Sequence, residues 1–509
     1  MSTYYLGIDI GTGTSKAALI DERCTPMLTR EVSHTLDTPH PGWLGCDAEK
    51  VIWGDCIRLC RSVLEGSGIA ATDIECVGLS CMGCDCIAID REGTALAPAI
   101  LYGADSRTTE EIAWINDHYQ DQAEKLFGHE VCTSDVAPKI LWLKRHEPEA
   151  WEGAAAFLTG SSYLCAKLCG NLTIDSYLAE DFMPLYHLAA RTPNAEGCEP
   201  FCKPSQLAQI MSATDIAGTV TEKAAEATGL APGTPVLVGT GDSGAEAIST
   251  GVFLPGDVMV QLGSSAYVIA LTDTLVDEPR LWPGTFVIPG TYGICAGTNT
   301  AGSLLAWMRN ELYPDALADQ DAGGPNAFEV MAREAASSVP GAHGLLCLPY
   351  FAGERTPLND PLARGSFFGL STSHTRADLT RAAIEGVAFS VWQILDVLDQ
   401  QGVPCHKVMC VGGGTKNEVW LQTTANMLER PVHTTDITIG AAYGDALMAA
   451  LASGAYGGWE ELAELVRPQR TIEPQPELYP VYRRIKAQLT SLYTSTRELA
   501  HELAGQQGV

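Results

Sequence analysis

The sequence predicts an α/β protein that contains a duplicated domain. Strand-like and helix-like segments alternate along its first half, and such alternation is typical of α/β folds. An apolar strand at 4–10 runs into a turn rich in glycine and threonine, and a second apolar run follows at 16–20. The same order of strand, small-residue turn and strand recurs at 259–269. Two hairpins of one kind, far apart in the chain, indicate two related domains.

Apolar runs and helical periodicity predict the other elements. Strands are expected at 76–80, 87–89, 235–238 and 407–411, and helices at 48–64, 108–118 and 482–503. The segment 321–326 is expected to be a surface loop, and the small residues at 440–446 are typical of a closely packed helix start. We place the domain boundary within 239–251, which gives domains at 1–243 and 244–509.

Composition limits the function classes. The chain has 509 residues, of which 46% are hydrophobic and 18% charged, enough for two or three globular domains. Its net charge of −30 argues against nucleic acid and anionic membranes as partners. Because neither a basic signal-peptide start nor a membrane-length apolar run is found, we expect a cytoplasmic protein.

The cysteines predict reduced thiols rather than a disulfide framework. They number 17, an odd count, and are spread over a long chain. The run Cys81–Cys86 has no partner pair at zinc-ribbon spacing, so the sequence does not favour a metal site there.

The first turn is suited to phosphate binding. Its residues are Gly11, Thr12, Gly13 and Thr14, followed by Lys16. Glycine lets the backbone approach a ligand, and N–H groups, hydroxyls and an ammonium can contact phosphate oxygens. Asp9, at the end of the preceding strand, is placed to hold a hydrated Mg²⁺. The turn is neither a Walker loop nor a dinucleotide fingerprint, and a hairpin without a ligand is the alternative.

Two further glycine-rich segments each allow two interpretations. Asp242 lies in 239–245, where a strand ends and a helix begins. It could be a general base that takes a proton from a hydroxyl, or a helix cap, and position alone favours the cap. The run Gly412–Gly414 could let a base or ribose pack against the backbone, or form an ordinary tight turn. The polar loop at 348–357 has no chemistry assigned by its composition.

Several motifs together resemble the FGGY family of carbohydrate kinases, most closely its xylulokinase-like branch. The most specific is Gly365–Leu370 followed, after seven residues, by Asp378–Glu385. A second family pattern fits 137–146 with one mismatch, because Val136 stands where Pro, Ser or Thr is usual. The loop at 348–357 is similar to a third. The motifs extend from Leu6 to about Leu451, nearly the whole chain.

The resemblance implies two actin-like, ribonuclease H-like ATPase domains flanking an active-site cleft. It implies that Asp242 is the catalytic base and that Asp9 lies near the metal, which reverses the local preference for a cap. The residues that match nucleotide or phosphate contacts are Gly11, Thr12, Gly13, Thr14, Gly263, Ser264, Gly302, Gly413 and Asn417. Thr is commoner than Ser at position 264.

One segment departs from the family pattern. Xylulokinases carry Gln-Met-His and glycerol kinases Gln-Arg-Glu as sugar contacts, where this chain has Met82-Gly83-Cys84. Sugar specificity depends on such polar pairings, so xylulose is put in doubt. Asp85 is expected to compensate beside Met82. Asp105 and Arg107 lie in a segment that resembles a motif near the sugar, and a helix cap with a solvated arginine is their alternative.

We therefore expect a kinase that uses ATP and Mg²⁺ to phosphorylate a small sugar or polyol. A ketopentose such as D-xylulose is favoured, with ribulose, gluconate or a glycerol-like acceptor as alternatives. Its partner would be this small molecule, and a homodimer is the assembly to test. A non-kinase ATPase of the actin superfamily would need a substrate-binding tail or polymer insertions, and little sequence follows Leu451. A sugar-sensing regulator would need a DNA-binding motif and a basic patch, which the net charge opposes. A family member that binds sugar without turnover is a further alternative.

Overall fold

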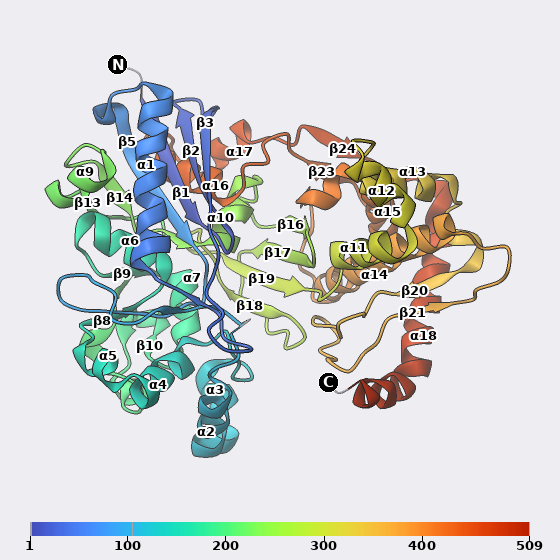
Figure 1. Ribbon diagram of the computed structural model, residues 1–509, viewed down its shortest axis with the longest axis horizontal. Helices are drawn as coiled ribbons and strands as arrows, with labels where there is room; N and C mark the ends of the chain where they lie inside the picture. Colours follow the sequence, from blue (N-terminus) through green and yellow to red (C-terminus); the bar gives the residue numbers. More distant parts are fainter. Residues whose placement is uncertain (1–2, 104, 508–509) are drawn as a thin grey trace. The chain divides into compact units, whose positions relative to one another are not determined.

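A computed structural model describes residues 3–103 and 105–507, which form two compact units (Figure 1). The first unit consists of Met1–Phe253, Gly284–Thr291 and Ile439–Val466. The second consists of Leu254–Pro283, Tyr292–Thr438 and Arg467–Val509. These bounds differ from the expected domains at 1–243 and 244–509, so the division into domains stays a prediction.

The first unit is built on a mixed sheet with the strand order β13-β14-β5-β1-β2-β3, and β15 also pairs with β5. The strands are β1 Tyr4–Ile10, β2 Thr14–Asp21, β3 Pro26–Ser33, β5 Ile74–Cys81, β13 Ile216–Thr219, β14 Pro235–Leu237 and β15 Thr240–Gly241. β1, β2 and β3 are antiparallel neighbours, whereas β1, β14 and β15 all run parallel to β5. In this register Asp9 and Thr240 are both level with Ser80. The carboxyl ends of three parallel strands therefore meet at one edge.

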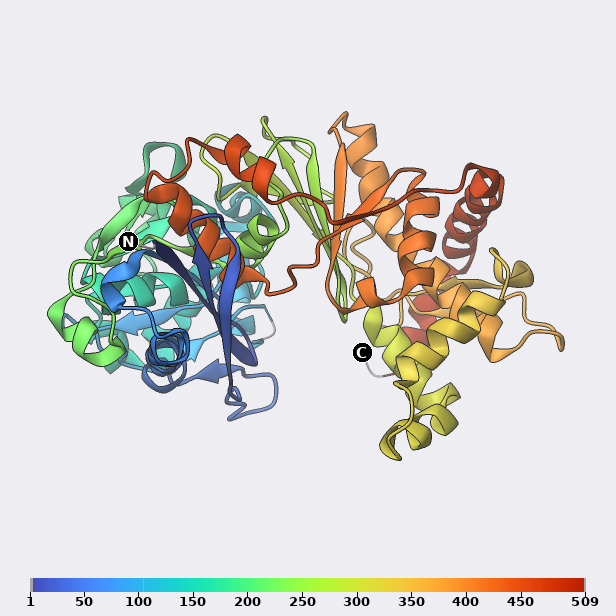
Figure 2. The same cartoon turned by 90° about the horizontal axis from the view of Figure 1, so that it is seen from above.

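Helices cover both faces of this sheet, so β1 and β5 are buried along nearly their whole length. Figures 1 and 2 place α1 (Gly54–Ser67) and α16 (Ala441–Ala452) on opposite faces. The other helices of the unit are α2 Thr109–Tyr119, α3 Ala123–Phe127, α4 Val136–His146, α5 Pro148–Gly153, α6 Gly160–Cys169, α7 Ser176–Ala179, α8 Ala195–Cys198, α9 Glu222–Thr228, α10 Asp242–Ser249 and α17 Trp459–Leu465. A π-helical turn at Glu49–Trp53 precedes α1.

Helix α16 packs directly on the backbone of β1 and β5. A Cβ atom at Gly7 would lie 1.9 Å from the carbonyl oxygen of Ala442, and one at Gly78 would lie 2.1 Å from that of Asp445. A Cβ atom at Gly444 would lie 1.9 Å from the carbonyl oxygen of Ala245 in α10. These distances are far shorter than a van der Waals contact, so only glycine fits at the three positions.

The second unit repeats this plan. Its sheet has the order β18-β19-β17-β16-β22-β23-β24. The strands are β16 Asp257–Leu262, β17 Ala266–Thr272, β18 Trp282–Thr285, β19 Tyr292–Gly297, β22 Lys407–Val411, β23 Val432–Thr434 and β24 Arg470–Ile472. β19, β17 and β16 are antiparallel, and β22 runs parallel to β16, just as β5 runs parallel to β1. The predicted α/β fold with a duplicated hairpin is confirmed.

Helices of the second unit include two that are longer than the rest. They are α14 Arg376–Gln400 and α18 Tyr479–Gln506, beside α11 Gly302–Leu312, α12 Pro314–Asp321, α13 Ala327–Ser337 and α15 Glu418–Leu428. The predicted loop at 321–326 is exposed and joins α12 to α13. Two-stranded ladders complete the fold: β4 Gly45–Cys46 with β7 Ala99–Ile100, β6 Ile87–Ile89 with β8 Ala156–Leu158, β9 Thr173–Asp175 with β12 Gln209–Met211, β10 Tyr186–His187 with β11 Thr192–Pro193, and β20 Leu346–Leu348 with β21 Ser366–Phe368.

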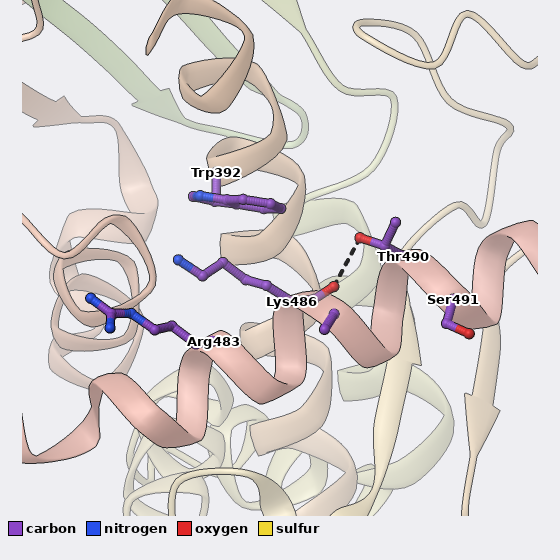
Figure 3. Close-up of a pocket in the computed structure, with 6 residues that line it drawn as sticks. Trp392, Arg483, Lys486, Thr490 and Ser491 are labelled. Atoms are coloured by element: carbon purple, nitrogen blue, oxygen red, sulfur yellow. Dashed lines mark hydrogen bonds between the residues drawn. The ribbon is translucent and has the colours of Figure 1, made fainter. Parts of the chain in front are cut away.

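A surface hollow of about 540 Å³ lies between α14 and α18 of the second unit (Figure 3). Figure 3 shows the side chain of Lys486 below the ring of Trp392, and its Nζ atom lies 4.8 Å from the ring centroid. Lys486 also donates to the carbonyl oxygen of Met427 and to Glu429. Among the described residues, none of the site residues predicted from the sequence lines this hollow. Within the same described ranges, no helix combines the length and apolar character that crossing a membrane requires.

The glycine contacts of α16 give a stability prediction. Gly78→Ala should lower the free energy of unfolding by about 1–3 kcal/mol, the usual effect of overpacking, because the new methyl group meets backbone atoms of α16. Gly505→Ala in α18 is the matched control, since a Cβ atom there meets nothing within 4 Å. It should be neutral or stabilising by up to about 1 kcal/mol. Denaturant titration measures both, and equal stability of the two variants would contradict the packing argument.

Candidate active site

Four acidic side chains interact at the carboxyl edge of the first unit's parallel strands. Asp9 ends β1, Asp242 begins α10 directly after β15, Glu246 lies one turn further along α10, and Asp445 lies in α16. The charge of Asp242 contributes to the raised pKa of each of the other three. Ligands of open α/β sheets bind at this edge, beyond the carboxyl ends of the strands.

Ser80 connects two of these carboxyl groups. Its hydroxyl oxygen lies 3.0 Å from Asp9 Oδ1 and 2.6 Å from Asp445 Oδ2, and all three side chains are buried. A serine hydroxyl has one proton and can donate to one carboxylate at a time. Burial raises the pKa of Asp445 well above its usual value. Asp9 and Asp445 therefore compete for the hydroxyl proton of Ser80.

Burial also raises the pKa values of the two residues with predicted chemical roles. It raises the pKa of Asp9 to about 7, with Asp242 adding to the shift and Ser80 and Lys16 opposing it. It raises the pKa of Asp242 to about 6, opposed by the hydrogen bond from the Ser243 N–H. Carboxylate oxygens gathered in this way are the donors that hard divalent cations prefer. The site can thus hold such a cation and supply an ionised base beside it.

Asp242 is not the N-cap residue of α10. Gly241 occupies that position, and Asp242 is the first helical residue. Its Oδ1 atom accepts the backbone N–H of Ser243 at 2.7 Å, and the side chain remains partly exposed. The hydroxyl of Ser243 in turn lies 3.0 Å from the Tyr177 hydroxyl. One carboxylate oxygen is thus fixed by the backbone, which orients the side chain.

The turn between β1 and β2 is exposed at Thr12 and Gly13. A Cβ atom at Gly11 would lie 2.8 Å from the carbonyl oxygen of Thr14, so the turn needs glycine there. A Cβ atom at Gly13 would meet nothing within 4 Å, which leaves that side of the turn open. Lys16, in β2, pairs with Glu31 at 3.4 Å and also interacts with Asp9.

His34, which the sequence did not point to, holds this turn in place by hydrogen bonds. The backbone N–H of His34 donates to Gly13 O at 3.2 Å, and its Nε2 atom lies 3.2 Å from Thr12 O. Its Nδ1 atom lies 2.8 Å from Asp55 Oδ2, and Asp55 also accepts the hydroxyl of Ser15 at 2.6 Å. Asp55 comes from α1, so the helix and the turn are held together. Only the fold brings these residues into contact, so no local sequence pattern predicts their interaction.

The residues predicted to contact a sugar have protein partners in the structure. Asp105 is 1% exposed, accepts the Leu44 N–H at 2.8 Å and pairs with Arg107 at 2.6 Å. The Arg107 guanidinium lies 4.7 Å from the ring centroid of Trp43, so the alternative of a solvated arginine is wrong. It also lines a hollow of about 410 Å³.

Met82 and Asp85, the other two predicted sugar contacts, are also buried. Asp85 Oδ1 accepts the Gly160 N–H at 2.9 Å. Cys84, between them, donates to Asp181 at 3.1 Å. Direct contact of Met82, Asp85, Asp105 or Arg107 with a sugar therefore stays a prediction.

In the second unit, three residues predicted to contact nucleotide lie together. Gly302 begins α11, and its N–H donates to Gly263 O at 2.9 Å in the turn between β16 and β17. The carbonyl oxygen of Ser264 accepts the N–H groups of Ala301 and Ser303. A Cβ atom at Gly302 would lie 2.5 Å from Gly263 O. The second hairpin is thus joined to a helix N-terminus, where the helix dipole favours anions.

Gly413 and Asn417 lie at the same edge of that sheet. They follow β22, whose last residue, Val411, is paired with Gln261 near the end of β16. A Cβ atom at Gly413 would meet nothing within 4 Å. Asn417 is the N-cap of α15, and its Oδ1 atom accepts the Trp420 N–H at 3.2 Å. All five predicted contacts of this unit therefore share one sheet edge.

The loop at 348–357 supports this edge. Glu354 is 2% exposed and accepts the Asn299 N–H at 2.9 Å. Arg355 donates to Thr298 O at 2.7 Å, and the Thr356 hydroxyl donates to Gly297 O at 3.0 Å. Burial raises the pKa of Glu354 to about 7. The loop fixes the segment that leads from β19 into α11.

Comparison with known proteins decides the family. Residues 4–249 match the N-terminal domain of the FGGY family of carbohydrate kinases, and residues 258–453 match its C-terminal domain. The chain belongs to the FGGY family of carbohydrate kinases. It is accordingly an enzyme that phosphorylates a carbohydrate, and FGGY kinases use ATP as the phosphate donor.

This FGGY kinase is similar over its full length to proteins named xylulose kinase. It is 27% identical over 508 residues to xylulose kinase of Staphylococcus epidermidis, covering 98% of both chains. It is 25% identical over 484 residues to gluconokinase of Bacillus subtilis, covering 92% of this chain and 91% of the relative. The crystal structure of xylulose kinase from Rhodospirillum rubrum is 30% identical, with a TM-score of 0.88 over 98% of this chain and 100% of that one.

The buried carboxyl groups predict how stability depends on pH. The pKa values of Asp9 and Asp85 are raised to about 7, chiefly by burial. The folded chain therefore binds protons that the unfolded chain releases near pH 4, and the free energy of unfolding falls as pH rises from about 5 to 7. We expect a higher Tm at about pH 6 than at about pH 8 by calorimetry. Asp85→Asn should narrow this difference, and a Tm that is higher at the alkaline pH would refute the argument.

Proposed function

We propose that this kinase transfers the γ-phosphoryl group of ATP, bound with Mg²⁺, to a hydroxyl group of a ketopentose, with D-xylulose as the first candidate acceptor. One observation carries the mechanism. Asp9 and Asp242 lie at the carboxyl ends of two strands that flank β5, and the charge of Asp242 helps to raise the pKa of Asp9. A base and a metal-organising carboxylate are thereby held on the same sheet edge.

Asp242 acts as the general base. Its Oδ1 atom is engaged by the Ser243 N–H, so the other oxygen is available to accept the proton of the acceptor hydroxyl. With a pKa of about 6, the carboxylate is mostly ionised at neutral pH and yet more basic than an ordinary aspartate. It orients the hydroxyl and takes its proton as the oxygen attacks phosphorus.

Asp9 would hold the Mg²⁺ ion. Its carboxyl group accepts the Ser80 hydroxyl, and bound Mg²⁺ would favour its ionised form. When bound, Mg²⁺ would neutralise charge on the transferring phosphoryl group. Lys16 and the turn Gly11–Thr14 would bind phosphate oxygens on the same side of the first unit. Local donors are needed for this, since a chain with a net charge of −30 repels an anionic substrate at long range.

The second unit would bind the nucleotide. Gly263 and Ser264 lie against the N-terminus of α11. Gly302, the first residue of that helix, lets the helix approach the turn closely. This anion-favouring arrangement suits phosphate. Gly413, open on its Cβ side, and Asn417, beside it, would contact the adenosine.

D-xylulose is favoured by the full-length relatives named xylulose kinase, and gluconate is the second candidate because gluconokinases also match. The triplet Met82-Gly83-Cys84 lacks the polar side chains that xylulokinases carry at this place. An unpaired buried hydroxyl costs about 1–3 kcal/mol. The acceptor would therefore be held mainly by other groups. Asp242 and Asp85 are candidates, because one carboxylate oxygen of each is engaged by a backbone N–H and the other has no hydrogen bond among the described residues.

Asp242→Asn tests the base. The amide keeps the shape of the side chain but cannot accept the proton, so kcat should fall by about 10²–10⁴-fold, with the affinity for ATP nearly unchanged. Asp90→Asn is the matched control, because Asp90 is also partly buried and its Oδ1 atom accepts backbone N–H groups. The control should keep wild-type kcat.

The pH profile gives an independent check of the same residue. In the wild type, kcat/KM should decline as pH falls through about 6, because protonation removes the base. A kcat of Asp242→Asn close to wild type would reduce Asp242 to a structural role at the start of α10.

The substrate is tested by ADP release with a panel of ketopentoses, ketohexoses, pentitols, glycerol and gluconate. D-xylulose should stimulate ADP release, and chelation of Mg²⁺ should abolish it. If only gluconate stimulates ADP release, D-xylulose is the wrong acceptor, but the proposed kinase mechanism still holds. Failure of every acceptor, with ATP and sugar both bound in calorimetric titrations, would indicate a family member that binds without turnover.

A further inference from the structure

The segment that joins α3 to α4 in the first unit gathers an imidazole, a thiol and a carboxylate (Figure 1). One potential ligand atom from each of His129, Cys132 and Asp135 lies within 4.8 Å of the other two. The residues are three apart in sequence, so a single turn of chain brings them together. Our sequence analysis did not single them out, because His-x-x-Cys-x-x-Asp matches no common metal motif.

The orientation of Asp135 and His129 points to a shared ligand. Asp135 is the N-cap residue of α4, yet its side chain makes no cap hydrogen bond to the helix. Instead Oδ2 accepts the Cys132 N–H at 2.8 Å, and Oδ1 faces His129 Nε2 at 3.3 Å. His129 Nδ1 lies 3.0 Å from the carbonyl oxygen of Glu130. In metal sites, a histidine is typically oriented by such a bond from its second ring nitrogen.

The same geometry argues against a thiol nucleophile activated by histidine. Such a site needs one ring nitrogen on the thiol and the other on the carboxylate. Here Nε2 faces Asp135 and Nδ1 faces a backbone carbonyl, so neither is committed to Cys132. Three donors of this chemistry, all within 4.8 Å of one another, suit a cation better than a proton relay.

Carboxyl groups outnumber ammonium groups around this cluster. Asp135 is 1% exposed and interacts with Asp181, another buried carboxylate, which in turn interacts with Glu180. The only counter-charge that the described structure shows at these groups, apart from His129, is Lys139. Its ammonium donates to the carbonyl oxygens of residues 133, 134 and 135, which fixes the base of the turn. Beside the imidazole, three carboxyl groups thus share one ammonium among the described residues.

We propose that His129, Cys132 and Asp135 form a binding site for a borderline-soft divalent cation of the Zn²⁺ class, with solvent as the fourth ligand. Tetrahedral Zn²⁺ with these donors needs ligand atoms about 3.3–3.8 Å apart. Because the three atoms lie within 4.8 Å of one another, a contraction of at most about 1.5 Å closes the site. His129 and Cys132 are exposed and can move this far. The nitrogen and sulfur donors separate this site from the all-oxygen set at Asp9, which suits Mg²⁺.

Cobalt titration of the full chain tests the site, because thiolate-bound Co²⁺ gives a charge-transfer absorption that oxygen and nitrogen ligands do not. The metal-free protein, reduced with a phosphine, should bind one Co²⁺ with this absorption, and Zn²⁺ should displace it while millimolar Mg²⁺ should not. Cys132→Ser should abolish the absorption. His129→Ala should weaken Zn²⁺ binding, measured by competition, by at least about 100-fold, the upper end of the loss caused by an outer-shell change.

Cys405→Ser is the matched control, a partly buried thiol of the second unit that should leave the titration unchanged. Both site variants alter exposed side chains, and a Tm equal to wild type without metal would confirm that they fold. If Cys132→Ser and His129→Ala bind Co²⁺ and Zn²⁺ as the wild type does, the cluster is only a His129–Asp135 ion pair and the proposal fails. The measurement is independent of kinase activity, so it stands or falls apart from the proposed function.

Discussion

The first unit depends on the direct packing of α16 against the backbone of β1 and β5. Gly7 and Gly78 leave no space between sheet and helix, and a methyl group at either position would overlap carbonyl oxygens of α16. This close approach brings Asp445 within hydrogen-bond distance of Ser80, which in turn bonds Asp9. The chemistry at the strand ends therefore rests on a helix–sheet contact made without side chains.

The most specific family motif includes Asp378–Glu385, and the role of this part is structural rather than chemical. Asp378 forms a capping box with Thr375 at the start of α14. Four residues separate Arg381 from Glu385, and the two pair at 2.9 Å while Arg381 also donates to the Tyr482 hydroxyl. The motif thus fixes one long helix against α18. The groups with proposed catalytic roles lie instead on turns at strand ends, where the backbone is exposed and the scaffold is rigid.

Much of the framework could be predicted because its signals are local. Alternating apolar runs and small-residue turns identified both hairpins, and β6 has the predicted bounds, 87–89. The roles of Asp445 and His34 could not be predicted in this way, because their partners come from distant strands and helices. Arg107 illustrates another limit: its charge suggested either a ligand contact or solvation, whereas the fold encloses it beside Asp105 and two tryptophans. A sequence shows which groups are present, but not which ones neutralise each other.

The late position of α16 in the sequence has a consequence for the order in which the two units can fold. The ribosome releases β1 early, whereas the helix that covers it comes from Ile439–Val466, after most of the second unit. Until then the glycine-lined face of the nascent sheet has no cover. Domains usually fold as their sequence emerges, from the N-terminus onward, but here the earlier unit is completed only after most of the later unit has been made. The acidic centre, which includes Asp445 of α16, therefore forms only after most of the second unit has been synthesised.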